Sequence, residues 1–285
     1  MSQQRTQFAS KFGIIAAAVG SAVGLGNIWK FPYTVGTNGG GAFLVTYLLC
    51  VLLMGFPAMV TEMSIGRMSQ ASVLDAFKQL SGKKCWNFIG VMGMLAAFLI
   101  LGFYLVVAGW SLEYLVQSIS TFSFQNMTTE QLEQNFETFS VHSARPYLWA
   151  IVFILLNIVV IRMGVQKGIE KCSRILMPML FVVIIYLAVS AFFLPNSSAG
   201  YKFYLSADFS KITPSVVLSA LGQSFFSLSL GMGAILTYGS YVKQGNIVHT
   251  SLQICILDTL IAVLAGLVIF PSVFAYGLEP GQGPS

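Results

Sequence analysis

The sequence predicts an all-α membrane protein with about seven membrane-spanning helices. Of its 285 residues 56% are hydrophobic and only 9% are charged, whereas a soluble domain carries roughly 25% charged residues. The mean hydropathy is +0.78, and apolar stretches of about 20 residues or more recur along the chain. Lipid offers no partner to backbone N–H and C=O groups, so stretches of this kind must be helical.

The apolar stretches define the spans in chain order. They cover residues 11–37, 42–66, 87–118, 147–163, 170–194, 214–242 and 247–275. Several exceed the ~20 residues that cross a bilayer, which indicates tilt or extension beyond the lipid. With a cytoplasmic N-terminus, eleven Lys and Arg lie inside and four outside, so the positive-inside rule predicts that orientation. The net charge of +5 therefore does not indicate a nucleic-acid partner.

The first and sixth spans are rich in glycine at mid-membrane depth. The first contains Gly20-Ser-Ala-Val-Gly-Leu-Gly-Asn27 and the sixth contains Ser227-Leu-Ser-Leu-Gly-Met-Gly-Ala234. Glycine costs a helix about 1 kcal/mol relative to alanine. Close packing through small residues is the alternative explanation. The two Gly-x-Gly pairs, however, occupy corresponding places in spans of opposite direction, a pattern that favours two broken helices around a transporter site.

A broken helix has chemical consequences inside a membrane. Unwinding frees N–H and C=O groups that must face a polar cavity, because lipid cannot satisfy them. The N-terminus of a half-helix attracts an anion such as a carboxylate, and the freed carbonyls suit a hard cation. A zwitterionic amino acid bound together with Na⁺ meets both requirements in one cavity.

Two acidic residues lie within predicted spans, Glu62 in the second and Asp258 in the seventh. A carboxylate in that environment is costly and indicates a function. Glu62 has two equal interpretations: it caps amides freed at the sixth-span break, or it takes part in gating. For Asp258 a cation-coupling role is favoured, because its span contains no Lys or Arg that could serve as a partner.

The glycine-rich strings and several others resemble one known family, the neurotransmitter:sodium symporters, whose structural type is the bacterial leucine transporter. The matching strings are Gly20 to Pro32, Asn38-Gly-Gly-Gly-Ala-Phe43, Gly55-Phe-Pro57, Lys167-Gly-Ile-Glu170 and Gly222 to Ala234. The resemblance covers essentially the whole chain. It implies the leucine-transporter-type fold, in which spans one to five and six to ten form inverted repeats.

Members of that family have eleven or twelve spans, so this chain is expected to be truncated to about seven. Residues 1–194 would form the first repeat, and residues 195–285 the start of the second, with spans six and seven and part of an outer loop. The last residues, Gly277 to Ser285, have the composition of a loop, and we expect the chain to be cut there. Because alternating access needs two repeats, residues 1–285 alone are expected not to transport.

The resemblance implies two sodium sites. The first would use the carbonyl of Ala22 and the side chains of Asn27, Ser227 and Asp258. The second would use the carbonyls of Gly20 and Val23, with its other ligands on an eighth span that this chain lacks. The family usually has Asn at the Asp258 position. An aspartate there supplies the negative charge that chloride supplies in chloride-dependent members. The residues that match the chloride pocket, Tyr47, Gln223 and Ser227, are therefore expected to need no anion.

The resemblance also implies a substrate site between the two breaks. The substrate carboxylate would contact the amides of Leu25 and Gly26 and the hydroxyl of Tyr104. The substrate amine would contact the carbonyls of Ala22, Phe226 and Ser227 and the hydroxyl of Ser229. Ile100, Phe226 and Met232 would line the side-chain pocket. Monoamine transporters of the family have Asp at the Gly24 position, so glycine implies a substrate with its own carboxylate, and Met232 in place of Phe favours a larger or aromatic side chain.

Some residues of this chain match the gate positions of the family that it resembles. Lys30 occupies the position of the outer gate Arg, and Arg5 with Phe8 matches the inner latch. The implied function is Na⁺-coupled symport of a hydrophobic or aromatic L-amino acid in a bacterial plasma membrane, with no chloride requirement. The alternatives are a non-transporting amino-acid sensor of the same fold and an inactive fragment. No nucleophile–base pair, metal cluster or phosphate loop indicates an enzyme, and the oligomeric state is not predicted.

Overall fold

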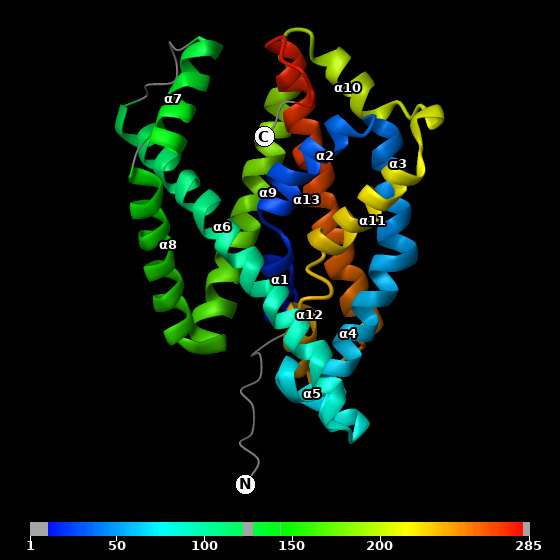
Figure 1. The fold of residues 1–285 in the computed structure, drawn as a ribbon. Helices are drawn as coiled ribbons and strands as arrows, with labels where there is room; N and C mark the ends of the chain where they lie inside the picture. Colours follow the sequence, from blue (N-terminus) through cyan, green and yellow to red (C-terminus); the bar gives the residue numbers. More distant parts are fainter. Residues whose placement is uncertain (1–10, 122–127, 143, 282–285) are drawn as a thin grey trace. The chain divides into compact units, whose positions relative to one another are not determined.

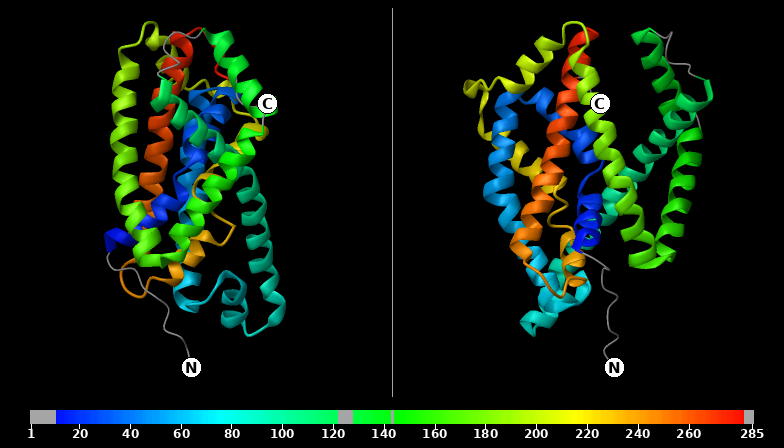
Figure 2. Two further views of the ribbon diagram at one scale, coloured as in Figure 1. Left: turned by 90° about the vertical axis from the view of Figure 1, so that its left-hand side faces the viewer. Right: turned by 180° about the vertical axis from the view of Figure 1, so that it is seen from behind.

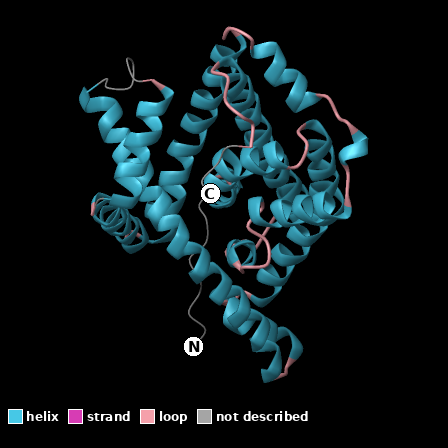
Figure 3. Ribbon diagram, turned by 45° about the horizontal axis from the view of Figure 1, so that its top comes forward, coloured by secondary structure: helices cyan, strands magenta, loops and turns pink. Residues whose placement is uncertain are grey.

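The computed structural model describes residues 11–121, 128–142 and 144–281, and every regular element in these ranges is a helix (Figures 1 and 3). The chain divides into two compact units. The first comprises the chain up to Met94 and from Val165 onward, and the second comprises Leu95–Gly164.

The first unit contains the glycine-rich segments. Its helices are α1 (Lys11–Ala22), η1 (Gly26–Lys30), α2 (Phe31–Thr37), α3 (Gly41–Cys50), η2 (Val51–Gly55), α4 (Phe56–Ser69), α5 (Val73–Ser81), η3 (Lys84–Trp86), η5 (Val165–Glu170), α9 (Lys171–Phe192), α10 (Ser197–Leu205), η6 (Phe209–Lys211), α11 (Pro214–Ser227), α12 (Ala234–Ser240) and α13 (Ile247–Ala275). Helix α6 (Asn87–Thr121) begins in this unit and continues into the second, which also holds α7 (Thr129–His142) and α8 (Arg145–Arg162).

The spans agree with the predicted membrane protein. Five helical stretches are long and apolar enough to cross a bilayer, namely 41–69, 84–119, 145–162, 165–192 and 247–275. Residues 13–22 and 26–37 form a sixth span that is bent by 49°. The predicted span 214–242 consists of two helices of 14 and 7 residues, each too short to cross alone. The first and sixth predicted spans are therefore broken, as predicted.

Helix α13 is the central support of the first unit. It packs against α4, α9, α10 and α1, and both views of Figure 2 show it running beside α9. Its buried face includes Ile254, Ile261, Ala265 and Phe270. Large apolar side chains remain exposed on α9 and α13, as expected for surfaces that face lipid tails.

Two glycines bring α12 into backbone contact with α4. A Cβ atom at Gly66 of α4 would overlap the carbonyl of Leu236, and a Cβ atom at Gly239 of α12 would lie 2.8 Å from the Cα atom of Met63. No larger residue fits at either position without separating the helices. Helix α12 is therefore held on α4 by close packing, in the manner of small-residue contacts between membrane helices.

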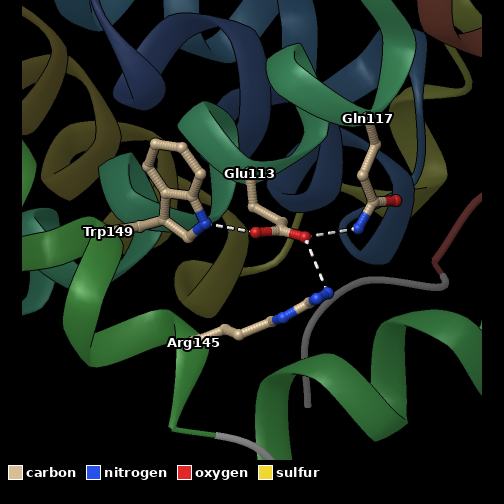
Figure 4. A network of polar contacts seen from close by, with 4 residues as sticks. All are labelled: Glu113, Gln117, Arg145 and Trp149. Carbon is tan, nitrogen blue, oxygen red and sulfur yellow. Dashed lines mark hydrogen bonds and ion pairs between the residues drawn. The ribbon is translucent and has the colours of Figure 1, made fainter. Parts of the chain in front are cut away.

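The second unit is organised around one buried carboxylate. Glu113 of α6 is 5% exposed. Its oxygens accept hydrogen bonds from Gln117 Nε2 at 2.6 Å, from Arg145 at 3.4 Å and from the indole N–H of Trp149 (Figure 4). Two of these donors lie on α8, so the carboxylate joins α6 to α8 inside the unit.

Aromatic side chains join α7 to α6 in the same unit. The Trp110 and Phe136 rings pack edge to face with centroids 5.2 Å apart, and Tyr114 and Phe139 do so at 6.1 Å. Such pairs contribute about 0.5–1.5 kcal/mol beyond the area that they bury. In the second unit, polar contacts therefore join α6 to α8, and aromatic contacts join α6 to α7.

We predict that Glu113→Ala destabilises the protein more than Arg145→Ala. Removing the carboxylate leaves the donors of Trp149 and Gln117 without their acceptor, which costs about 2 kcal/mol. The Arg145 side chain is 67% exposed, so loss of its ion pair costs at most about 1 kcal/mol. Thermal unfolding in detergent measures the difference, with Glu137→Ala, an exposed position on α7, as the control. Equal melting temperatures for the Glu113 and Glu137 variants would contradict the prediction.

Candidate functional site

The first break lies between α1 and η1. The α1 helix ends at Ala22, and the chain resumes helical structure about Gly26 with a π-helical turn. Gly24 closes the break locally, because its carbonyl accepts hydrogen bonds from the amides of Asn27 and Ile28, both at 3.1 Å. Its own N–H donates to Oδ1 of Asn27 at 3.3 Å. Asn27 is thereby fixed at the start of the second half-helix.

The second break separates α11 from α12. Ser229, Gly231 and Gly233 all have positive φ, at 54°, 80° and 79°. Glycine adopts this backbone conformation freely, whereas it is strained for serine. Leu228 and Leu230 alternate with these residues and are buried, so they anchor the unwound segment in the core. The sequence places glycine where the backbone needs it, and the strained residue is Ser229.

Glu62 supports the second break from α4. Its Oε1 atom accepts the N–H of Gly231 at 2.7 Å. An unwound N–H group has no partner within its own helix and would be costly in a membrane interior. The contact corresponds to the capping interpretation of Glu62, one of the two that the sequence leaves open.

A buried polar cluster joins the two breaks to α13. Asn27, Ser227 and Asp258 come from η1, α11 and α13, and all three are 0% exposed. The Asn27 side-chain amide donates to Asp258 Oδ1 at 2.9 Å and to Ser227 Oγ at 3.0 Å. Ser227 Oγ donates to Asp258 Oδ2 at 2.7 Å. Three residues that lie far apart in the sequence therefore share one site.

Two further predicted residues complete this cluster. The hydroxyl of Tyr47, on α3, donates to Ser227 Oγ at 3.4 Å. Gln223, on α11, donates from Nε2 to the carbonyl of Gly26 at 3.0 Å. Both side chains are buried. Phe31, which the sequence analysis did not single out, packs against the Tyr47 ring with centroids 4.8 Å apart.

The chemistry of the cluster favours a hard monovalent cation. Neither of the two ion pairs found among the described residues involves Asp258, so its charge is met only by hydrogen bonds from neutral groups. A buried carboxylate without a counter-charge is expensive. The described residues also hold no group of three or more His, Cys, Asp or Glu side chains suited to a metal ion. One carboxylate among neutral oxygens is a hard-cation environment.

The remaining predicted residues of the first unit lie around the breaks. Ser229 Oγ donates to the carbonyl of Ser21 at 3.3 Å, and Lys30 Nζ lies 3.7 Å from the centroid of the Phe226 ring. Ala22 and Val23 are buried. A Cβ atom at Gly24 would meet nothing within 4 Å. There is open space at the position where the sequence predicts substrate.

Some predicted positions remain predictions. Ile100 and Tyr104 lie on α6 in the second unit, so their part in the site is not tested. Arg5 and Phe8 lie outside the described residues. The roles of Gly20, Leu25, Gly26 and Met232, which belong to the first unit, are not tested either. Gly66 and Gly239 were not predicted as contact residues. A small residue inside an apolar span is the signal that could have identified them.

Comparison with known proteins identifies relatives along almost the entire chain. Residues 5–144 and 123–279 match the model of the sodium:neurotransmitter symporter family. An uncharacterized sodium-dependent transporter of Bacillus subtilis, YhdH, is 41% identical over 100% of this chain and 63% of its own length. The human sodium- and chloride-dependent creatine transporter 1 is 27% identical over 97% of this chain and 50% of its own length.

A solved structure shares the fold. The crystal structure of MhsT in complex with L-phenylalanine matches with a TM-score of 0.93 and 45% sequence identity. The match covers 98% of this chain and 64% of the MhsT chain. This chain therefore spans less than two thirds of the length of the relatives that it matches.

We predict that Glu62→Gln retains more thermal stability than Glu62→Ala. The amide oxygen of glutamine can still accept the Gly231 N–H, whereas alanine leaves that group unpaired at a cost of about 1–3 kcal/mol. Melting temperatures of the two variants in detergent, compared with the unmodified protein, test this expectation. If glutamine destabilises as much as alanine, the charge of Glu62 is required and the capping interpretation is wrong.

Proposed function

The chain belongs to the sodium:neurotransmitter symporter family, and from this premise we propose that its protein carries a hydrophobic or aromatic L-amino acid by Na⁺-coupled symport. Transport would proceed by alternating access around the two helix breaks. The observation that carries the proposal is the buried Asp258 carboxylate. It contacts Asn27 and Ser227 at 2.9 Å and 2.7 Å, and no described residue forms an ion pair with it.

Sodium supplies the charge that the cluster lacks. The proposed first-site ligands are the carbonyl of Ala22 and the oxygens of Asn27, Ser227 and Asp258. The proposed second site uses the carbonyls of Gly20 and Val23. With Na⁺ bound, one buried positive charge balances one buried negative charge, and the desolvation of both is offset by their attraction at short range.

An amino acid suits the open space beside Gly24. Gly24 has no side chain, and nothing lies within 4 Å of the position that a Cβ atom would take there. The proposed contacts for the substrate carboxylate are the amides of Leu25 and Gly26 with the hydroxyl of Tyr104. The carbonyls of Ala22, Phe226 and Ser227 and the hydroxyl of Ser229 would bind the amine. The carboxylate of a free amino acid thus fills the place that an acidic side chain fills in monoamine transporters.

The side-chain pocket favours an apolar or aromatic substrate. Phe226 lies near the end of α11 and Met232 lies within the second break, and Ile100 is the proposed third wall. A methionine thioether adapts to large groups and makes favourable contacts with rings. MhsT, which is 45% identical to this chain, has been solved with L-phenylalanine, which supports an aromatic substrate.

Chloride is not required in this proposal. Asp258 supplies a fixed negative charge next to Ser227, and the donors that an anion would need are already engaged. Gln223 donates to the Gly26 carbonyl and Tyr47 donates to Ser227. An added chloride would place a second negative charge beside the carboxylate, which is unfavourable in a medium of low dielectric constant.

The apolar spans make this a multi-pass membrane protein, and the bacterial relatives support a plasma-membrane location. The sodium-type oxygen ligands on the first span favour transport over amino-acid sensing, because a sensor has no need of ion coupling. The proposed partners are the amino acid, Na⁺ and the lipid bilayer.

Uptake by proteoliposomes tests the symport proposal. The protein is expressed from its complete reading frame and supplied with labelled phenylalanine, tryptophan, leucine and glutamate. We expect saturable uptake of the aromatic and aliphatic amino acids under an inward Na⁺ gradient, and none when K⁺ replaces Na⁺. Substrate binding without uptake under that gradient would support a sensor instead.

Replacing chloride tests the role of Asp258. With gluconate in place of chloride, uptake by the unmodified protein is expected to be unchanged. Asp258→Asn removes the fixed charge, so we expect uptake to fall at least about tenfold, the effect of ~1.4 kcal/mol, or to become chloride-sensitive. Glu137→Gln is the matched control, because Glu137 is exposed on α7. If the unmodified protein loses uptake when gluconate replaces chloride, the proposal is wrong.

A further inference from the structure

A basic segment joins the spans 41–69 and 84–119 at one face of the membrane. It contains α5 and the turn that follows, and Figure 1 shows α5 beyond the lower end of α4. Its charged residues are one aspartate and three lysines, all of them exposed: Asp75, Lys78, Lys83 and Lys84. The positive-inside rule predicts that this face is cytoplasmic.

The protein itself does not neutralise these lysines. Neither of the ion pairs found among the described residues includes one of them, and Asp75 accepts a hydrogen bond from Ser72 at 3.1 Å. A lysine in the last turn of a helix complements the helix dipole, which accounts for Lys78. Lys83 and Lys84 lie beyond the end of α5, so the dipole does not account for them.

The turn after α5 has a fixed backbone. Gly82 has a φ of 72°, and its N–H donates to the carbonyl of Lys78 at 2.8 Å. The N–H of Lys83 donates to Ser81 Oγ at 3.2 Å. These bonds end the helix and hold the next residues in one conformation, so the three positive charges stay within one short segment.

Apolar side chains continue this basic segment. Trp86 of η3 is 49% exposed, and Phe88 and Ile89 at the start of α6 are exposed as well. The apolar span begins at Lys84, so the lysines and Trp86 lie where lipid headgroups meet the acyl chains. Tryptophan favours that depth, and a lysine there extends its ammonium group to the headgroups.

We propose that Lys78, Lys83 and Lys84 form a docking surface for the headgroups of anionic phospholipids, with Trp86 as its anchor in the bilayer. The phosphate of such a lipid carries the charge that the lysines lack, and each lysine near an anionic membrane surface strengthens binding about fivefold. An acidic protein partner would also match the charges, but it would give no reason for the exposed Trp86 and Phe88 beside them.

Helix α5 is in direct contact with the second break. A Cβ atom at Gly233 would overlap the side chain of Val73, and a Cβ atom at Gly90 of α6 would overlap the Val73 carbonyl. Val73, the first residue of α5, is therefore packed between the second break and α6. A headgroup bound on α5 restrains the second break through this contact. Its effect on transport rests on the proposed function, whereas the docking of headgroups does not.

A fluorophore on Cys85 reports which lipids gather at the lysines. Cys85 is exposed and lies between Lys84 and Trp86. The protein is expressed from its complete reading frame with its other cysteines replaced by alanine, labelled at Cys85 and placed in nanodiscs of phosphatidylcholine with a small fraction of phosphatidylglycerol. Either lipid carries a nitroxide quencher close to its headgroup, at equal mole fraction. The ratio of the two quenching efficiencies measures the local enrichment of phosphatidylglycerol.

We expect phosphatidylglycerol to be enriched at least about fivefold over phosphatidylcholine, and the enrichment to disappear when glutamine replaces all three lysines. The matched control removes the same charge from three other exposed lysines on the same predicted face. It is expected to keep the enrichment, and its substitutions are Lys167→Gln, Lys171→Gln and Lys243→Gln.

Equal quenching by the two lipids in the labelled protein with its lysines intact would overturn the inference, and an acidic protein segment on the lysines would give that result. Enrichment that survives the loss of all three lysines would overturn it as well. If the triple variant does not fold, salt at about 1 M, where the Debye length is about 3 Å, is expected to abolish the enrichment around the unsubstituted lysines. Enrichment that persists in that salt would also overturn the inference.

Uptake by proteoliposomes tests the restraint on the second break. We expect uptake to rise about threefold when phosphatidylglycerol replaces part of the phosphatidylcholine, and the triple variant to show no rise. Equal uptake in the two lipid mixtures, with the enrichment intact, would show that α5 does not restrain the second break. The absence of uptake in either mixture counts against the proposed symport and leaves the result on headgroup docking standing.

Discussion

Every backbone N–H and C=O group inside a bilayer must find a partner in the protein or in a polar cavity, and the first unit is arranged around two places where the helix cannot supply one. Gly24 and Asn27 satisfy each other at the first break. At the second, Glu62 accepts the N–H of Gly231. Unwound carbonyls and amides suit a cation and a zwitterion, which is the chemistry on which the proposed function relies.

The helices around the breaks act as rigid supports. Helix α13 carries Asp258 to the cluster and packs on α4 and α9, while α12 is fixed to α4 through glycine contacts that leave no space for adjustment. Because packed interfaces of this kind have discrete arrangements rather than continuous ones, movement is expected at interfaces that contain solvated or charged groups.

Four carboxylates illustrate how one membrane protein uses buried charge in different ways. Glu113 accepts three donors and joins two helices of the second unit. Glu62 accepts one unwound amide and Glu170 forms an ion pair with a partly exposed arginine. Only Asp258 is fully buried and surrounded by neutral donors. The difference in partners, rather than the residue type, separates structural carboxylates from the one suited to bind a cation.

The sequence by itself determined the membrane class, the two broken spans and the residues around them, because length, hydropathy and glycine clusters are local properties of the chain. It could not choose between capping and gating for Glu62, and it gave no reason to single out Glu113 or Glu170 as contact residues. Those assignments depend on which helices become neighbours: Glu113 meets Trp149 across 36 positions, and Glu62 meets Gly231 across 169. Contacts over such distances arise from the packing of whole helices, so only the tertiary structure could decide them.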